Sequence, residues 1–483
     1  MEHRRKSERR EFRNRVITYI VMTLSVVVLA TFAILYVAGY RFDFGARSVE
    51  QSGMVQFASK PIEATVEVDG KTLSTKTPTK SDVLPGDHSF VMWREGYETW
   101  FKALNIKAGT LTWLNYARLI PKQRPVEAVD SLPGVTATLA APGGKAYATL
   151  TTGDEASIRF YDISKDKIAE SKTASLVDSG SPGASFGLVG WDPSGRYLLV
   201  SQKSADGKIE WLVVDRIDLD VGNITRSMGV AFQKVVFADD SGAKFYGLAE
   251  GNVRSVDTAA GILSRPMVSG VVDFWYNKEQ KIISYLESAQ AETGYRTVGI
   301  VRPGGKPVNI HRTDTDTKVP LSIRTARYFG VNYVAILEGQ TITLLSGKLP
   351  EVENDSMTHV YQMKVDNVVT SYEFSPSGRF LFVQQGDKYQ SYDIERGSLS
   401  ALNTLPGDGE ARQIRWLDDF MIWSDRGGNL AFAEFDGANI HKNINSVASG
   451  FDVALSPNGR YLYSVGQSEG GLQLQRIRMI LEN

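Results

Sequence analysis

The chain has 483 residues, of which 42% are hydrophobic and 23% charged, so its composition is that of a folded protein rather than a disordered chain. Its 54 basic and 55 acidic side chains leave a formal charge of −1, which argues against a chain built as a whole to bind nucleic acid. The absence of cysteine excludes disulfides, iron–sulfur clusters, cysteine-containing zinc sites and thiol nucleophiles. At about 150 residues per domain, the length predicts roughly three domains.

The first 40 residues predict a membrane anchor. Residues 1–15 carry seven basic and three acidic side chains, a net charge of +4, whereas residues 16–40 carry no Asp, Glu, Lys or Arg. About 20 apolar residues cross the ~30 Å hydrocarbon core of a bilayer as a helix. Because basic residues favour the cytoplasmic side, we predict a cytoplasmic head at 1–15, a transmembrane helix at 16–40 and an extracytoplasmic chain from residue 41 to 483. The alternative is a cleaved signal peptide, whose apolar core is usually about 7–15 residues and so shorter than this run.

A small β domain is predicted after a stem at residues 41–53. Short segments of alternating polarity follow, separated by Asp-Gly, Pro-Gly-Asp and Ala-Gly turns, and Asp69-Gly70 is the two-residue signal of a β-hairpin. The segments lie at residues 54–61, 64–71, 88–97, 99–109 and 110–121. Five or six strands in about 70 residues predict a small β-sandwich at residues 54–121.

The order of the turn motifs in this segment resembles that of the PEGA domain, a small β domain of prokaryotic envelope and surface proteins. The matching motifs are Pro61-Ile62-Glu63-Ala64, Val68-Asp69-Gly70, Thr77-Pro78, Leu84-Pro85-Gly86-Asp87-His88 and Gly96-Tyr97. The first motif departs from the family pattern, because Ile62-Glu63 stands where Glu-Gly is usual. The resemblance implies an envelope-associated binding or spacer module without known chemistry.

Aromatic side chains are concentrated in this small domain. Three of the chain's eight tryptophans are Trp93, Trp100 and Trp113, and Tyr97 lies near the first two. Because exposed aromatic rings stack on sugars or anchor a partner, Trp93, Tyr97 and Trp100 are the candidate binding residues. The alternative is that these rings form the core, since a small domain without disulfides needs large side chains to bury enough surface.

Residues 134–483 contain an internal repeat. Its clearest copies are Asp192-Pro193-Ser194-Gly195-Arg196, Ser375-Pro376-Ser377-Gly378-Arg379 and Ser456-Pro457-Asn458-Gly459-Arg460. In each copy proline presets φ, glycine supplies a left-handed position, and an apolar run typical of a buried strand follows. With weaker copies included, eight turns from Gly144 to Gly459 average 45 residues per unit, which is the length of a four-stranded propeller blade.

The second half of each unit resembles the outer strand pair of WD40-like and TolB-like propellers, because a strand ends in Asp before a polar turn. We therefore predict a mainly β fold, with an N-terminal transmembrane helix, a PEGA-like β-sandwich and a β-propeller at residues 122–483. Eight blades are favoured; seven is the alternative, because the unit around Tyr328 has lost the turn motif. The last unit shows three clear strands, so we expect a strand from about residues 122–132 to complete it and close the ring.

The sequence offers little for catalysis. Outside the basic head, the histidines are His88, His311, His359 and His441, which fall in four different units. Two acidic clusters, one of Asp215, Asp218 and Asp220 and one of Asp314 and Asp316, do not have the spacing of a calcium loop and are interpreted as solvated loop charges. We predict no catalytic residues, no metal site and no cofactor. Carboxylates from distant blades that meet at the propeller axis are the alternative, because sequence spacing cannot show such convergence.

Together these features predict a non-enzymatic, single-pass membrane protein of the cell envelope that presents its propeller as a binding or scaffold platform outside the membrane. Its expected partners are the membrane, through residues 16–40, and an envelope protein, peptide or glycan, with no nucleic acid. The alternatives are a propeller-based hydrolase that acts on envelope glycan or peptide, and a protein that relays external binding through its helix.

Overall fold

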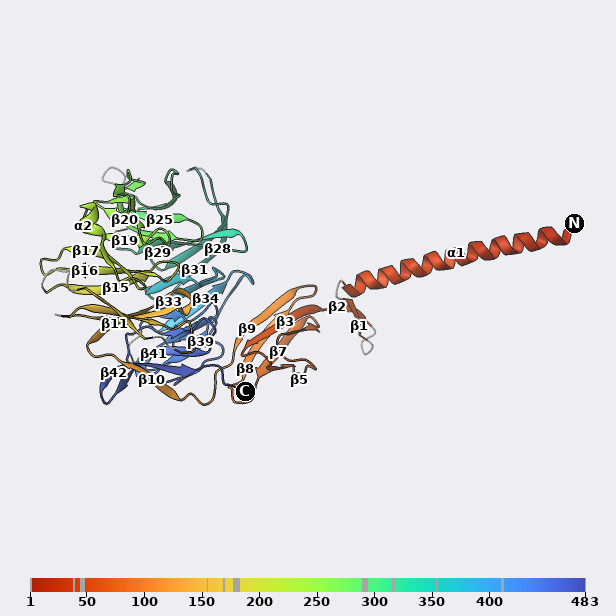
Figure 1. Cartoon of the computed structure of the whole chain (residues 1–483). Coiled ribbons are helices and arrows are strands. Elements are labelled where there is room, and N and C mark those ends of the chain that lie inside the picture. The colour runs from red at the N-terminus through yellow and green to blue at the C-terminus, as the bar shows by residue number, and fades with distance from the viewer. Residues whose placement is uncertain are drawn as a thin grey trace. The chain divides into compact units, whose positions relative to one another are not determined.

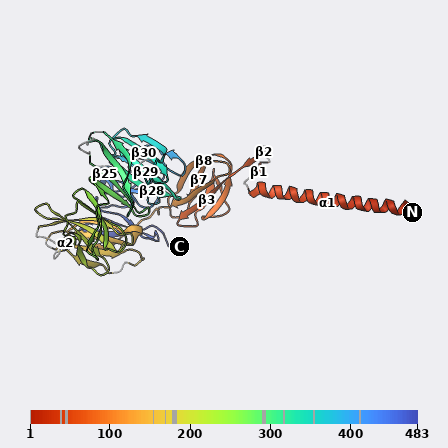
Figure 2. The ribbon, with the colours of Figure 1, turned by 90° about the horizontal axis from the view of Figure 1, so that it is seen from above.

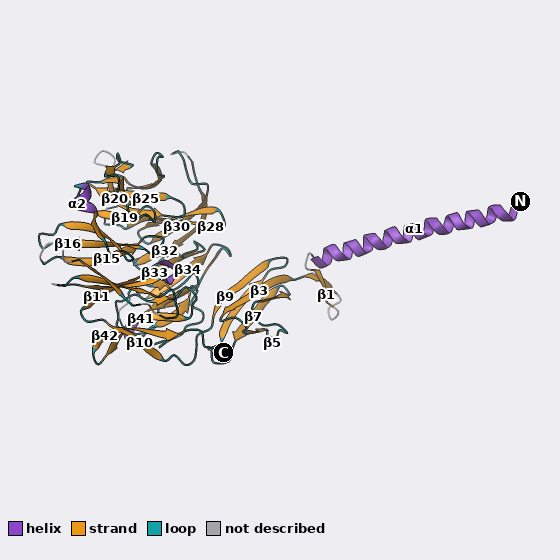
Figure 3. Ribbon diagram, in the orientation of Figure 1, coloured by secondary structure: helices purple, strands orange, loops and turns teal. Residues whose placement is uncertain are grey.

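The structure is a computed structural model that describes residues 2–37, 40–43, 48–153, 155–167, 170–176, 183–288, 294–314, 316, 318–352, 355–409 and 412–482. Contacts divide the chain into two compact units, Met1–Lys122 and Gln123–Asn483. Among the described residues one long helix precedes a chain that is mostly strand (Figure 3).

The N-terminal helix α1 spans Glu2–Val37, and its segment Phe12–Leu35 is long and apolar enough to cross a membrane, with a mean hydropathy of 2.3 and none of it buried inside the protein. The helix differs from the predicted span of 16–40 at both ends. It includes the basic head because Lys, Arg and Glu are good helix formers. It ends before Tyr40, which begins strand β1 (Tyr40–Asp43). Since β1 pairs with β2 (Ser48–Gln51), the predicted stem contains a hairpin; residues 38–39 and 44–47 lie outside the described residues.

Two sheets follow the hairpin. The first has the order β6-β3-β9, with β3 at Gly53–Lys60, β6 at Thr79–Val83 and β9 at Leu111–Arg118. The second has the order β5-β4-β7-β8, with β4 at Thr65–Val68, β5 at Lys71–Thr72, β7 at Gly86–Trp93 and β8 at Trp100–Ile106. The fully buried Phe57 and Phe90, one from each sheet, have ring centroids 5.7 Å apart. The predicted small sandwich is confirmed, and β6 adds a strand that the sequence did not predict.

The turn motifs of this sandwich contact one another. Asp69 and Gly70 both have left-handed φ values, 50° and 75°, as a two-residue hairpin turn requires. The Asp69 carboxylate accepts a hydrogen bond from the Ser89 amide at 2.8 Å and contacts His88 Nδ1 at 2.6 Å. Glu63 also has a left-handed φ of 65°, so the substitution of Glu for the usual glycine leaves the backbone turn intact.

Residues 123–483 fold into eight successive sheets, and all their described strand pairs are antiparallel (Figure 1). Sheet 1 consists of β11 (Val135–Ala140), β12 (Ala146–Thr151), β13 (Ser157–Asp162) and β14 (Lys172–Ser175). Sheet 2 consists of β15 (Ser185–Trp191), β16 (Tyr197–Lys203), β17 (Ile209–Asp215) and β18 (Val221–Asn223). Sheet 3 consists of β19 (Lys234–Phe237), β20 (Lys244–Ala249), β21 (Asn252–Asp257), β22 (Ile262–Leu263) and β23 (Val268–Ser269). Helix α2 (Ile224–Met228) follows β18, and the 3-10 turn η1 (Pro142–Gly144) joins β11 to β12.

Sheet 4 consists of β24 (Val271–Asn277), β25 (Ile282–Glu287), β26 (Arg296–Val301) and β27 (Val308–Thr313). Sheet 5 consists of β28 (Leu321–Tyr328), β29 (Val331–Glu338), β30 (Thr341–Gly347) and β31 (Thr358–Lys364). Sheet 6 consists of β32 (Ser371–Phe374), β33 (Phe380–Gln385), β34 (Lys388–Asp393), β35 (Ser398–Leu399) and β36 (Asn403–Thr404). Sheet 7 consists of β37 (Arg415–Trp416), β38 (Met421–Ser424) and β39 (Ala431–Glu434), with the 3-10 turn η3 (Arg426–Gly428) between the last two. Sheet 8 consists of β40 (Ala454–Leu455), β41 (Tyr461–Ser468), β42 (Gly471–Arg478) and β10 (Val126–Ser131).

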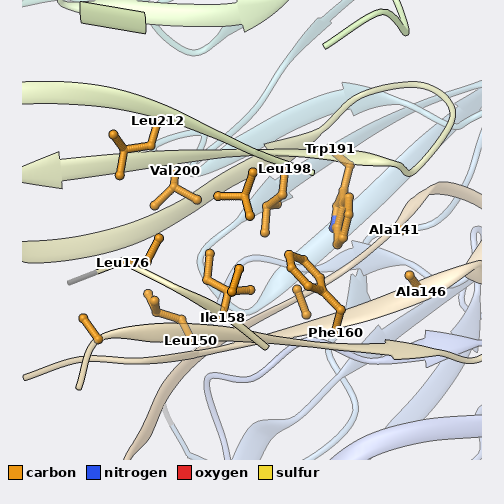
Figure 4. Packing of buried hydrophobic residues seen from close by; sticks show 14 residues of the cluster. Ala141, Ala146, Leu150, Ile158, Phe160, Leu176, Trp191, Leu198, Val200 and Leu212 are labelled. Carbon is orange, nitrogen blue, oxygen red and sulfur yellow. The ribbon is translucent and has the colours of Figure 1, made fainter. Parts of the chain in front are cut away.

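The eight sheets form a closed ring. Separate hydrophobic cores lie between sheets 1 and 2, 2 and 3, 3 and 4, 4 and 5, 5 and 6, 6 and 7, and 8 and 1. Sheets 7 and 8 are joined by hydrogen bonds from Asn445 to Ser464 at 3.1 Å and from Gln475 to the Ser446 carbonyl at 2.7 Å. Figure 4 shows the core between sheets 1 and 2, where Phe160 and Trp191 meet with ring centroids 5.8 Å apart. This arrangement is a β-propeller of eight blades, as predicted; Figure 2 shows it from a second direction.

The ring is closed by an N-terminal strand. Strand β10 pairs antiparallel with β42, with Val126 opposite Ile477 and Ser131 opposite Gln473. In Figure 1 the orange β10 accordingly lies beside the blue β42. The expected completion of the last blade by residues 122–132 is confirmed.

The repeated turn is stabilised by its own side chains. Ser375 Oγ accepts a hydrogen bond from the Phe380 amide at 3.2 Å, which explains why a short polar residue precedes the proline. Gly378 has φ +79°, and a Cβ at this position would lie 2.7 Å from the Arg327 carbonyl of the neighbouring sheet. Glycine is therefore required both by the backbone conformation and by the packing of adjacent blades.

The arginine of this turn contacts the aspartate that ends the third strand of the same blade. Arg379 Nη2 lies 2.8 Å from Asp393 Oδ2, and Arg196 Nη2 lies 2.6 Å from Asp215 Oδ2 and 2.7 Å from Asp218 Oδ2. The interpretation of Asp215 as a solvated charge was therefore wrong, because its side chain is 9% exposed and pairs with Arg196, whereas Asp218 is a solvated loop charge, 57% exposed, that also contacts Arg196. In blades 2 and 6 the two sequence signatures of the repeat are therefore the two halves of one ion pair.

Candidate functional site

The first strands of the blades bring charged side chains together around the propeller axis. In every sheet the first strand lies at one edge of the strand order, and β28 contacts both β24 and β32, so the first strands converge. Six consecutive blades place a charged side chain there, and the sign alternates around the ring. These residues are Lys234, Asp273, Arg324, Glu373, Arg415 and, two positions before β40, Asp452.

Lys234 and Asp273 form an ion pair between blades 3 and 4. Lys234 Nζ lies 2.7 Å from Asp273 Oδ1, and it lies 5.4 Å from the ring centroid of Trp275. The two charged side chains are 31% and 40% exposed, so water reaches the first strands.

Arg324 lies between two aromatic rings. Its Cζ is 4.3 Å from the ring centroid of Trp275 and 5.1 Å from that of Tyr372, which come from the blades on either side. The buried Tyr372 hydroxyl lies 2.8 Å from Ser322 Oγ, which fixes that ring. Cation–π contacts on both sides hold the guanidinium group in one orientation.

Glu373 is largely buried beside two arginines. Burial raises the pKa of its carboxyl group to about 7, while the positive charges of Arg324 and Arg415 and the indole of Trp416 act in the opposite direction. Within the described part of the chain, this carboxylate has no cationic group at ion-pair distance. Glu373 is thus a carboxyl group that changes its charge near neutral pH.

Arg415 and Asp452 connect blades 7, 8 and 1. Arg415 Nη1 lies 3.0 Å from Asp452 Oδ1, and the Ala140 amide of blade 1 donates to Asp452 Oδ2 at 2.8 Å. The Asp452 amide in turn donates to Thr138 Oγ1 at 2.7 Å. Arg415 remains 48% exposed, so its guanidinium group has room for a further partner.

We call Trp275, Arg324, Tyr372, Glu373 and Arg415 the inner-strand cluster. Its chemistry suits the binding of a charged group between planar donors and aromatic rings. Among the described residues, no group of three or more His, Cys, Asp or Glu could hold a metal ion.

The candidate aromatic platform of the small sandwich is wrong for two of its three residues. Tyr97 is 3% and Trp100 1% exposed, and Trp100 packs edge-on against Tyr116 with ring centroids 5.9 Å apart. Trp93 is 41% exposed, and its indole N–H donates to Glu67 Oε1 at 2.9 Å. The core alternative therefore holds for Tyr97 and Trp100, whereas Trp93 alone can present a ring to a partner.

Among the histidines outside the basic head, His88 and His311 make side-chain contacts within the β domains. His88 contacts Asp69 at 2.6 Å and the Leu84 carbonyl at 2.8 Å, and His311 Nε2 lies 2.9 Å from Glu338 Oε2. These contacts belong to the small sandwich and to blades 4 and 5 respectively, so they assemble no common site.

The sequence prediction missed the inner-strand cluster. A signal existed, because Arg324, Glu373 and Arg415 each lie on the first strand of a unit, shortly before its turn. The sequence left open whether carboxylates from distant blades meet at the axis. The positions of the first strands show that charged residues of both signs, arginines as well as carboxylates, are brought together there.

A comparison with protein families agrees with the small sandwich. The family model described as PEGA domain matches residues 52–120, which contain both sheets of the small sandwich. No curated protein matches the chain significantly. Solved structures similar to the chain include a prolyl endopeptidase (12% identity, 74% of this chain and 55% of that chain, TM-score 0.46). They also include an oligogalacturonate lyase from Vibrio parahaemolyticus (11%, 74% and 98%, 0.40) and the β-propeller domain of Myceliophteria thermophila Cps50 (12%, 73% and 99%, 0.37). These scores lie below 0.5, so the propeller assignment rests on strand order and blade packing.

Proposed function

We propose that this PEGA-domain protein with an eight-bladed propeller is a non-enzymatic, membrane-anchored protein of the cell envelope that offers its propeller as a binding platform outside the membrane. The observation that carries the proposal is α1, whose apolar segment Phe12–Leu35 has none of its surface buried inside the protein. An exposed apolar helix of this length is stable in a bilayer and not in water. The net charge of +4 over residues 1–15 supports a cytoplasmic N-terminus.

The platform function is supported by the construction of the ring. Seven inter-sheet cores and the β10–β42 pairing make the blades rigid, while the exposed turns and first strands are free to contact a partner. The inner-strand cluster supplies the chemistry for such contact.

The alternative function is hydrolysis of envelope glycan or peptide, and Glu373 is the observation in its favour, because a carboxyl group with a pKa of about 7 can act as a general acid or base. Glycoside hydrolysis, however, uses two carboxyl groups that flank the bond. The charged groups that act on Glu373 are both arginines. We therefore favour binding over hydrolysis.

Topology is tested by single cysteines in the full chain, since the sequence contains none. We expect Glu469→Cys, at an exposed position of blade 8, to react with a membrane-impermeant maleimide in intact cells, and Ser7→Cys to react only after permeabilisation. The reverse pattern would overturn the proposed orientation.

Function is tested by crosslinking the full chain in its native envelope and capturing it by affinity. Recovery of a specific envelope protein, peptide or glycan supports the platform. Cleavage of an envelope glycan or peptide by the purified chain, abolished in Glu373→Gln, would establish the hydrolase instead.

A further inference from the structure

We propose that the inner-strand cluster binds a carboxylate-bearing ligand, whose anionic group lies against Arg324 and Arg415 and whose non-polar part packs on Trp275. This inference rests on the proposed function, because it names the ligand class of the same platform.

Arg324 is the main anchor of the proposed site. Among the described residues, its side chain donates one hydrogen bond, from Nη1 to the Ile323 carbonyl at 3.0 Å, and has no carboxylate at ion-pair distance. A guanidinium group has five N–H donors in a planar fork that matches a carboxylate. The rings of Trp275 and Tyr372 hold this fork in place, so little conformational entropy is lost when an anion binds.

Arg415 supplies the second donor group. It is engaged with Asp452 through Nη1, yet its side chain is 48% exposed. Glu373 lies on β32, and the two arginines come from the first strands of the blades on either side of it, Arg324 from β28 and Arg415 from β37. With Glu373 protonated, Arg324, Arg415 and Asp452 sum to a single positive charge, which matches a carboxylate better than a phosphate of charge about −2.

Glu373 makes the site dependent on pH. It is faced by Arg324 from β28 and by Arg415 from β37, while Tyr372 precedes it on β32 and the non-titratable Phe382 lies opposite it on β33. Below its pKa of about 7 the neutral Glu373 can donate a hydrogen bond to the ligand, whereas above it the two carboxylates repel each other. The protonated fraction falls from about 0.9 at pH 6 to about 0.1 at pH 8, so we expect affinity to fall about tenfold over this range.

The test uses the full chain in detergent and measures retention of small acids by ultrafiltration and mass spectrometry. The probes are a library of N-acetylated tripeptides with a free C-terminal carboxylate, the same library as C-terminal amides, and hexanoate. Comparing the acid library with the amide library measures how much the carboxylate contributes to retention. Comparing the peptide acids with hexanoate distinguishes a peptide chain end from a fatty acid as the ligand.

We expect acids to be retained at least tenfold more than their amides, and more at pH 6 than at pH 8. Arg324→Met should reduce retention about 10- to 100-fold, as loss of a charge-assisted hydrogen bond implies. Glu373→Gln should remain folded and remove the pH dependence. The control Arg226→Met changes an arginine that pairs with Glu210 in blade 2 and should bind as the wild type does.

The inference is overturned if acids and amides are retained equally or if no acid is retained. It is also overturned if a folded Arg324→Met variant binds acids as the wild type does. Capture of an envelope partner that survives Arg324→Met would overturn this site and leave the platform function standing. The two failures are therefore distinguishable.

Discussion

Replacing Arg379 with methionine should destabilise the propeller strongly, because it leaves the buried Asp393 carboxylate with only the more distant Arg396, whose Nε lies 3.8 Å from Asp393 Oδ2. Arg379 Nε and Nη2 contact the two Asp393 oxygens at 3.1 and 2.8 Å, and Nη1 lies 2.6 Å from Glu395 Oε2. The side chains of Arg379 and Asp393 are 5% and 6% exposed. Removing one partner of such a pair costs about 3–5 kcal/mol. For a domain of about 360 residues this corresponds to a fall in Tm of about 4–7 °C.

The chain offers a matched control in the last copy of the same turn. Arg460 pairs with Asp166 of blade 1, and the two side chains are 53% and 44% exposed. Because an exposed ion pair contributes about 0–1 kcal/mol, Arg460→Met should lower Tm by less than about 1.5 °C. The two substitutions remove the same side chain from the same turn motif, and they differ in the burial of the ion pair and in the number of carboxylates that the arginine contacts.

The assay is thermal unfolding of the full chain in detergent, followed by tryptophan fluorescence. A double variant, Arg379→Met with Asp393→Asn, should recover part of the loss, because the buried charge is then gone along with its partner. Equal shifts for Arg379→Met and Arg460→Met, or no recovery in the double variant, would refute the explanation by burial.

Three further predictions concern ring closure, the small sandwich and pH. Ser131→Cys with Gln473→Cys should form a disulfide on oxidation, seen as a gel shift after denaturation, because these residues are opposite each other on β10 and β42; failure to crosslink would contradict the closure. Trp100→Ala should cost about 3–5 kcal/mol and Trp93→Ala less than about 1 kcal/mol in urea unfolding, since only Trp100 is buried; similar losses would contradict this core. The pKa of Glu373 is about 7 in the folded state and 4.5 for an ordinary glutamate. Between these pH values the folded chain therefore binds more protons than the unfolded chain, and the free energy of unfolding falls by up to about 3 kcal/mol as pH rises from 4.5 to 7. Glu373→Gln should therefore be more stable than the wild type at pH 8 but not at pH 4.5, and a difference that does not vary with pH would contradict the assignment.

The repeat could be predicted from the sequence because its signatures are local. A turn of proline and glycine followed by a buried strand needs only a few adjacent residues to be recognised, and the Arg379–Asp393 contact shows why the turn and the strand ending recur together. Blade 5 kept its four strands although its turn became Phe329-Gly330, with φ values of 44° and 80°. A tight two-residue turn replaced the longer one, while the apolar pattern of β29 and β30 was retained.

Alternation of polar and apolar residues along β8 does not show which of its aromatic side chains are buried. Trp100 and Lys102 point to the same side of β8 and are 1% and 3% exposed, while Phe101 is 51% exposed. Because Lys102 lies on the buried face of β8, the sequence alone would assign that face to solvent. Lys102 is accommodated because its ammonium group lies 5.8 Å from the Tyr116 ring centroid, a contact that depends on β9 and is invisible in the sequence of β8.

The inner-strand cluster could not be predicted because its members come from separate units of about 45 residues and meet only when the ring closes. Its energetics differ from those of the blade turns. Arg379 and Asp393 pair with each other inside one blade. By contrast, Arg324 has no carboxylate partner among the described residues. Burial makes ionisation of Glu373 cost free energy relative to a carboxyl group in water. A propeller held by seven inter-sheet cores can tolerate that cost. Because local rules of packing and pairing are broken mainly where a protein functions, the uncompensated charges of blades 5 and 6 identify the part of the ring to which a ligand should bind.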